Sequence, residues 1–154
     1  MPNPTALNRA NPSAYQSLLV MGRAATTAAI DAGVDVKTIE LIRTRASQLN
    51  GCAYCLRMHT RDAIAAGEDS DRLAVLSAWR ETGYFTPMER SALAVTEAMT
   101  LVADLQSGRR AADEDEFAAL TDAQLSVVQW LVIAINAWNR VAIFSRYEVA
   151  PPPA

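Results

Sequence analysis

The chain has 154 residues, 51% of them hydrophobic, and a formal net charge of −3 at pH 7. This length suggests one domain with a sizeable core, and an acidic chain without a basic cluster argues against a nucleic-acid-binding surface. The polar, proline-bearing start of the chain lacks the apolar segment of a signal peptide, so we expect a cytoplasmic protein with no membrane association.

Apolar residues recur at helical spacing along most of the chain, and no segment shows the alternation of a strand. We therefore expect an all-α protein, with a compact domain of about six to seven helices over residues 12–148. An extended N-terminal tail (1–11) and a proline-rich C-terminal tail (149–154) flank it. The expected helices cover residues 12–32, 36–50, 53–66, 70–79, 88–105 and 121–137, with a further helical stretch up to 147.

Capping residues support several of these helix starts. Asn11 and Asp35 precede expected helices, and Thr86 and Thr121 begin Thr-x-x-Glu and Thr-x-x-Gln capping boxes. A helix, a break and a second helix occur around 36–66 and again around 88–137, which is compatible with two helical hairpins packed together. Polar residues interrupt the apolar stretch 125–144, so we expect a buried or subunit-contacting helix there rather than a membrane span.

Both cysteines and the only histidine of the chain lie in one short segment, as Cys52, Cys55 and His59. If that segment is helical, these spacings put the three side chains on one face, one turn apart. A helix N-terminus favours a thiolate, and a histidine one turn further on can take the thiol proton. The spacing therefore favours Cys55 as a nucleophile and Cys52 as the thiol that closes a disulfide with it.

Two other interpretations of the segment stay open. The cysteines can be inert and buried, or Cys-x-x-Cys-x-x-x-His can bind zinc in a non-enzymatic assembly protein, with Glu40 as a fourth ligand. Glu40 lies on an apolar helix twelve residues before Cys52. It is either a desolvated acid with a raised pKa, suited to proton transfer, or an ordinary ion-pair partner of Arg43 or Lys37.

Other polar and aromatic residues in the expected helices have mainly structural interpretations. Tyr54, between the cysteines, offers a hydroxyl to a proton path but is expected to pack. Glu97 is a further candidate to line a cavity at the site that Glu40 and the cysteines would form. Structural roles are nevertheless favoured for Glu97, Asn136 and Asn139. The tryptophans are expected to anchor the core or an interface: Trp79, Trp130 and Trp138.

The pattern Glu…Cys-x-x-Cys-x-x-x-His, which begins at Glu40 and ends at His59, resembles the alkylhydroperoxidase D core of the carboxymuconolactone decarboxylase-like superfamily. The resemblance is strongest over about residues 36–67 and extends more loosely to residues 135–143. It implies an all-helical, alkylhydroperoxidase D-like domain that forms trimers or hexamers. The chemistry implied is the antioxidant reduction of hydroperoxides by a dithiol pair, with no cofactor or bound metal and with an external dithiol as reductant.

Carried over by position, Cys55 is the peroxidatic thiol, Cys52 the resolving thiol, and His59 with Glu40 a proton relay. Tyr54 stands where alkylhydroperoxidase D has a second relay histidine, so the relay is shortened or altered here. The decarboxylase members use a related fold without this cysteine pair, whose presence speaks against lactone decarboxylation. A disulfide reductase or redox sensor that uses the same two thiols is the alternative.

Overall fold

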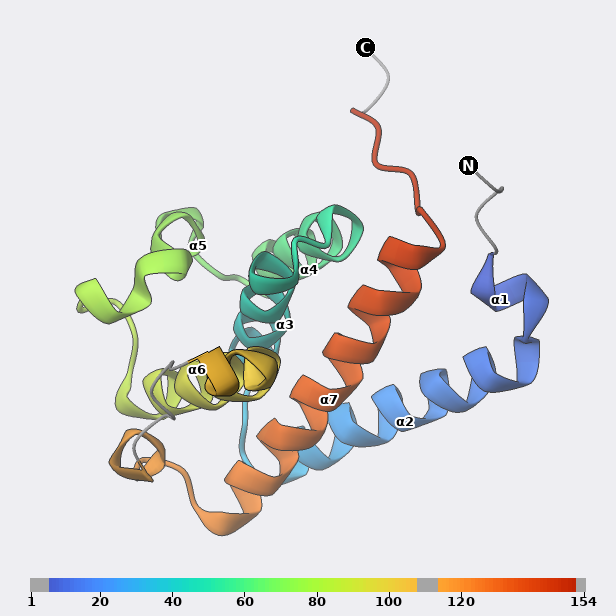
Figure 1. The fold of residues 1–154 in the computed structure, drawn as a ribbon. Coiled ribbons are helices and arrows are strands. Elements are labelled where there is room, and N and C mark those ends of the chain that lie inside the picture. Colours follow the sequence, from blue (N-terminus) through green and yellow to red (C-terminus); the bar gives the residue numbers. More distant parts are fainter. Residues whose placement is uncertain (1–5, 108–113, 152–154) are drawn as a thin grey trace.

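The computed structural model describes residues 6–107 and 114–151, and the regular structure in this part of the chain is helical throughout (Figure 1). This confirms the prediction of an all-α fold. The α-helices are α1 (Leu7–Ala10), α2 (Pro12–Asp31), α3 (Val36–Asn50), α4 (Ala53–Ala65), α5 (Ser70–Val75), α6 (Pro87–Thr100) and α7 (Asp122–Phe144). Three 3₁₀ segments join them at Leu76–Glu81, Val102–Ser107 and Glu114–Phe117.

The expected N-terminal tail is not extended throughout, since Leu7–Ala10 form α1. The backbone N–H of Leu7 donates to Ser145 Oγ at 3.2 Å, which ties this short helix to the end of α7. Asn11 precedes α2 as predicted, but its side chain makes no capping hydrogen bond. The parts of the expected tails at 1–5 and 152–154, together with residues 108–113, lie outside the described residues.

Three predicted helices differ from those observed. The fourth tightens into a 3₁₀ segment after Val75, which buries Leu76 and Trp79. The fifth ends at Thr100 rather than 105; Thr100 is the last buried residue of α6, and Val102 is exposed. The sixth and the further stretch to 147 form one helix, α7.

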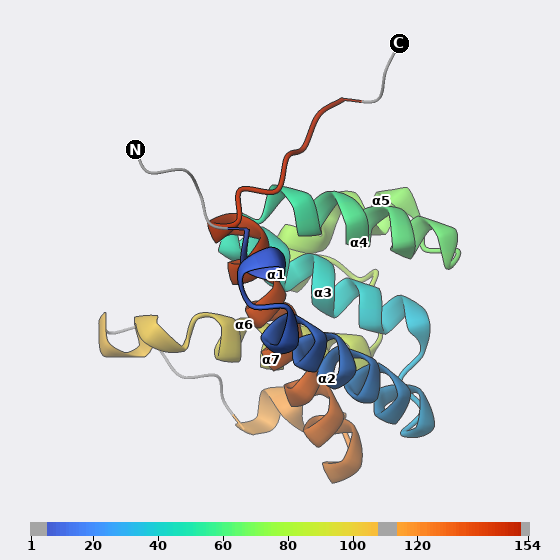
Figure 2. The same ribbon diagram turned by 90° about the vertical axis from the view of Figure 1, so that its right-hand side faces the viewer.

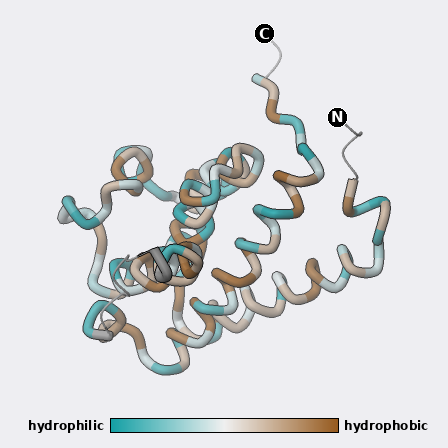
Figure 3. The backbone as a smooth tube through the Cα atoms, in the orientation of Figure 1, coloured by the Kyte–Doolittle hydropathy of each residue, from teal (hydrophilic) through white to brown (hydrophobic). Residues whose placement is uncertain are grey.

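The helices pack as two hairpins, as the sequence predicted. α3 lies against α4, α6 lies against α7, and α3 also contacts both α6 and α7. α2 packs along α7, and Figure 2 shows α4, α3 and α2 one below another. Hydrophobic and hydrophilic residues are interspersed along α2, α3 and α7 (Figure 3), as in helices that bury only part of their surface.

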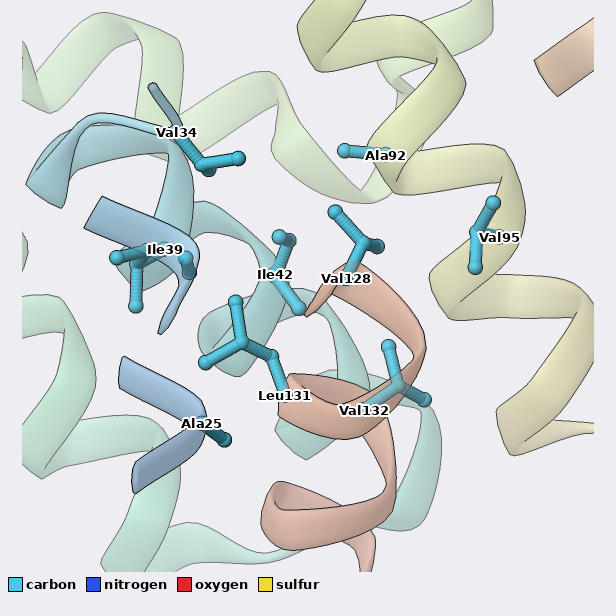
Figure 4. Close-up of a cluster of buried hydrophobic side chains, with 10 residues drawn as sticks. Ala25, Val34, Ile39, Ile42, Ala92, Val95, Val128, Leu131 and Val132 are labelled. Carbon is cyan, nitrogen blue, oxygen red and sulfur yellow. The ribbon is translucent and has the colours of Figure 1, made fainter. Parts of the chain in front are cut away.

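The main core forms where α2, α3, α6 and α7 meet (Figure 4). Ile39 and Ile42 of α3 point toward Val128 and Leu131 of α7, and all four side chains are fully buried. Each such side chain contributes about 1.5–3 kcal/mol of hydrophobic free energy relative to exposure. This core therefore holds α3, which carries Glu40, against the long helix that forms one wall of the site.

By length and composition, α7 is the one helix of the described segments that passes as a candidate membrane span. Core helices meet the same criteria, and Leu131, Val132 and Ile135 of α7 are buried inside the domain itself. The packing of α7 therefore agrees with the sequence-based expectation of a core helix.

Candidate active site

Glu40 is placed by α3. The Asp35 carboxylate accepts a hydrogen bond from the backbone N–H of Thr38 at 2.7 Å, which caps the helix as predicted. The residues around Glu40 on α3 are buried on nearly every side of the helix, and its own side chain is only 4% exposed. A carboxylate held so deep needs partners, because an unpaired buried charge is strongly unfavourable.

The cysteines lie at the start of α4, directly after a tight turn. Gly51 takes the left-handed conformation that ends α3, with φ of 66° and ψ of 30°, and Cys52 is the residue that caps α4. Cys52 Sγ accepts from the backbone N–H of Cys55 at 3.4 Å. The helix-break-helix predicted around Asn50-Gly51 is therefore what brings the two thiols to the helix N-terminus.

The two thiols face each other. Their sulfur atoms lie 2.6 Å apart, both residues are free cysteines, and both are almost fully buried. Burial, together with the hydrogen bond to Cys52, raises the pKa of the Cys55 thiol to about 12. The helix N-terminus does not outweigh that burial, contrary to the sequence-based expectation, so the resting thiol is protonated near neutral pH. Its reaction as a nucleophile requires a base.

His59 and Glu40 form a buried pair beside the thiols. His59 Nδ1 lies 2.8 Å from one Glu40 oxygen, and Arg43 donates to the other oxygen at 2.6 Å. Burial by itself raises the pKa of Glu40, but the hydrogen bond from His59 and the charge of Arg43 outweigh it, so the pKa lies below the ordinary value. Of the two alternatives left open by the sequence, the ion pair with Arg43 is observed and the raised pKa is not, although Glu40 is also buried.

An ionised Glu40 determines the state of the histidine. A carboxylate oxygen only accepts hydrogen bonds, so Nδ1 of His59 must carry a proton toward Glu40. In the neutral imidazole, Nε2 is then free to take a proton. The contact with Glu40 fixes the orientation of the His59 ring, and a carboxylate in this position favours a positive charge on the imidazole.

Asn139 is a neighbour of the thiols for which sequence reasoning favoured only a structural role. It is fully buried, receives a hydrogen bond from Asn50 at 2.8 Å and donates to Ser47 Oγ at 3.1 Å. A hydrogen bond between Asn139 and Cys55 acts to lower the pKa of that thiol against the effect of burial. In the sequence, the feature that points to a role for Asn139 at the site is its amide on an apolar helix. It follows Ile135 by four residues and therefore lies on the same face of the helix.

The remaining polar and aromatic candidates are divided between the site and the core. Tyr54 packs edge-to-face on Tyr147, with ring centroids 5.0 Å apart. Glu97 does not line the cavity beside the thiols. It pairs instead with Arg45 and accepts from the indole N–H of Trp79 at 2.9 Å, which confirms the structural interpretation.

A cavity of about 590 Å³ opens on this centre, between α2, α4 and α7. Cys55 and His59, four residues apart on one face of α4, both line it. Cys52 and Glu40 do not line it. The cavity therefore presents one thiol and the imidazole to a ligand, with the second thiol and the carboxylate behind them.

The atoms close enough to share a metal ion, among the residues described, belong to Glu40, His59 and Asp62, with their ligand atoms within 4.8 Å of one another. This group contains neither cysteine, so it differs from the four-ligand zinc site considered from the sequence. Glu40 and His59 already pair with each other, and Arg43 occupies the second Glu40 oxygen. These ligand atoms are therefore already used in hydrogen bonds and ion pairs, which makes them poorly suited to bind a cation.

Comparison with known proteins identifies the family and the fold. The chain is 40% identical over 109 residues to YdfG of Bacillus subtilis (strain 168), an uncharacterized protein, a match that covers 69% of this chain and 71% of the relative. The crystal structure of ATU0492 from Agrobacterium tumefaciens superposes with a TM-score of 0.83 at 27% identity, over 97% of this chain and 99% of that one. ATU0492 is described as a protein of unknown function, provisionally the antioxidant defence protein AhpD. Residues 14–98 match the carboxymuconolactone decarboxylase family, and the chain belongs to this family, with an alkylhydroperoxidase D-like fold.

Proposed function

We propose that this protein is a dithiol-dependent hydroperoxide reductase with an antioxidant role. The observation that carries the proposal is the pair of facing thiols, of which Cys55 opens on a large cavity beside a histidine that a buried carboxylate orients. The provisional assignment of ATU0492 to antioxidant defence supports the same chemistry. The cytoplasm is the location we propose, because its reducing milieu keeps a catalytic dithiol reduced.

The proposed reaction has three steps. His59 takes the proton of Cys55, and the sulfur attacks the terminal oxygen of ROOH, which breaks the O–O bond and oxidises the sulfur to a sulfenic acid. The alkoxide takes the proton back from His59 and leaves as the alcohol ROH. Cys52 then attacks the sulfenic sulfur, which releases water and forms the Cys52–Cys55 disulfide. An external dithiol returns two electrons and two protons and restores both thiols.

The direct test is a thiol titration of the reduced protein before and after one equivalent of cumene hydroperoxide. The chain has only two cysteines, so both thiols should disappear, and the intact mass should fall by two hydrogen atoms with no covalent dimer. One equivalent of cumyl alcohol should appear. Retention of both thiols after prolonged incubation would exclude the proposal.

Two further measurements separate the alternatives. If the same dithiol serves a disulfide reductase or redox sensor, protein disulfides should oxidise it much faster than hydroperoxides do. If the chain is a zinc-binding assembly protein, a sample purified without chelator should contain stoichiometric zinc. Either result would overturn the peroxidase proposal, whereas a zinc-free protein that prefers hydroperoxides supports it.

We also propose that the protein is a homo-oligomer, a trimer or a hexamer. Large apolar side chains stay exposed on the outer faces of α2 and α7, among them Val20, Ile30, Trp130 and Phe144. Apolar side chains that stay exposed along these two helices are available for contacts between subunits. Light scattering should give three or six times the 16.7 kDa chain mass, and Trp130→Lys should lower that mass. A monomer at micromolar concentration would contradict this proposal.

A further inference from the structure

The cavity beside Cys55 is far larger than the smallest peroxide needs. Its volume of about 590 Å³ corresponds to about twenty water molecules at their share of the liquid, whereas hydrogen peroxide has two heavy atoms. Cavities of this size take organic molecules with a substantial apolar body. The volume thus points to a bulky organic hydroperoxide.

One end of the cavity is aromatic. Tyr15 of α2 packs edge-to-face on Trp138 of α7, with centroids 5.1 Å apart, and Tyr54 meets Tyr147 there. Cys55 belongs to this end, since its sulfur lies 4.0 Å from the backbone oxygen of Trp138. An apolar group bound here would lie against flat ring surfaces directly beside the reacting sulfur.

The other end of the cavity is polar and cationic. Following α2 from Tyr15 to Thr27, the lining changes from aromatic to arginine and threonine over twelve residues, or about 18 Å of helix. Thr26 accepts a hydrogen bond from Arg43 at 2.6 Å, and Arg43 is bound to Glu40, which holds His59. Hydrogen bonds from His59 through Glu40 and Arg43 to Thr26 therefore connect the aromatic end of the cavity, which holds Cys55, with its cationic end.

Arg23 lies on α2 where the cationic end of the cavity begins. The residue lines the cavity, is exposed, and forms no ion pair within the described part of the chain. None of the described residues that line the cavity is acidic. Because Arg43 is already paired with Glu40, Arg23 is the guanidinium left to bind an anionic group of a ligand.

We propose that the cavity binds an amphipathic organic hydroperoxide that carries a carboxylate, of the fatty-acid hydroperoxide type. The apolar part lies against the aromatic end, the peroxide group lies at Cys55 and His59, and the carboxylate is bound by Arg23. This inference rests on the proposed hydroperoxide reductase function and specifies its substrate class.

The kinetic test compares the hydroperoxide of linoleic acid with its methyl ester, which differs only in the charged group. We expect kcat/KM to be about tenfold higher for the acid, because the ester cannot form the charge-assisted hydrogen bond with Arg23. Arg23→Gln should bring the acid-to-ester ratio close to one, and Arg23→Lys should keep most of it. Arg61→Gln is the matched control, since Arg61 is exposed on α4 and outside the cavity lining.

A binding measurement keeps this inference separate from the proposed function. Calorimetric titration of the reduced protein with laurate, which has no peroxide group, should show binding to the wild type and to Arg61→Gln, weakened about tenfold in Arg23→Gln. Arg23-dependent laurate binding without peroxide turnover would overturn the reductase function while the anion site stands. Peroxide turnover with equal rates for acid and ester, and laurate binding unaffected by Arg23→Gln, would overturn the anion site alone.

Discussion

Replacing Cys55 by serine is expected to lower the turnover of hydroperoxides by at least three orders of magnitude, because loss of the nucleophile leaves only binding and acid–base contributions. Cys55 is the thiol that lines the cavity, and the serine variant keeps the side-chain volume close to that of cysteine. The rate should be measured with cumene hydroperoxide and a dithiol reductant, and circular dichroism should verify the helical fold.

Cys52→Ser is the matched partner of this variant. Serine is a good N-cap, so α4 should form as before, while the resolving thiol is gone. The first oxidation should still occur, and a sulfenic acid on Cys55 should be trapped by dimedone, although turnover stops after one cycle. If Cys52→Ser abolishes the first oxidation and Cys55→Ser retains it, the roles of the two cysteines are reversed.

Much of this centre could be predicted from the sequence because its parts are close along the chain. Cys52, Cys55 and His59 lie within eight residues, and helical spacing alone places them on one face. The helix-break-helix pattern around 36–66 is compatible with a helical hairpin, and α3 does pack on α4. The partnership of His59 with Glu40 came from the family resemblance, and the two side chains lie 2.8 Å apart.

What the sequence did not predict depends on residues far apart along the chain or on competing energies. Asn139 reaches Ser47 across 92 residues, and helical periodicity carries no information about such a contact. The direction of the Glu40 pKa shift stayed open in the sequence, because burial raises this pKa while His59 and Arg43 lower it. Only coordinates show which effect is larger, since both the degree of burial and the partner distances enter the balance.

Burial also raises the pKa of Cys55, and this gives the buried acid and the histidine their parts in the proposed reaction. In the buried pair, Cys55 does not ionise by itself near neutral pH, because its pKa is about 12. A pKa five units above neutral corresponds to a thiolate fraction of about 10⁻⁵ at pH 7. In the proposed reaction, proton transfer to His59 during the attack would avoid the free thiolate, and ionised Glu40 would favour that transfer because it stabilises the imidazolium.

His59→Gln should therefore reduce kcat/KM for cumene hydroperoxide by about 10²- to 10⁴-fold at pH 7, the usual contribution of a general base. The remaining activity should rise about tenfold per pH unit in alkaline solution. This slope follows because the raised pKa of Cys55 leaves the thiol protonated until the pH approaches 12, so that hydroxide has to replace the missing base. Wild-type activity should depend less steeply on pH between about 7 and 9.

Glu40 acts through His59, so its variants need a readout beyond the rate. Glu40→Gln should lower kcat/KM by about a hundredfold or more, with a steeper pH profile like that of His59→Gln, and Glu40→Asp should recover part of the loss. Asp62→Asn is the matched control, because this exposed carboxylate lies 3.9 Å from His59 Nδ1 but does not line the cavity. If Asp62→Asn changes rate and pH profile as strongly as Glu40→Gln, the histidine takes its orientation from the exposed acid and the relay assigned to Glu40 is wrong.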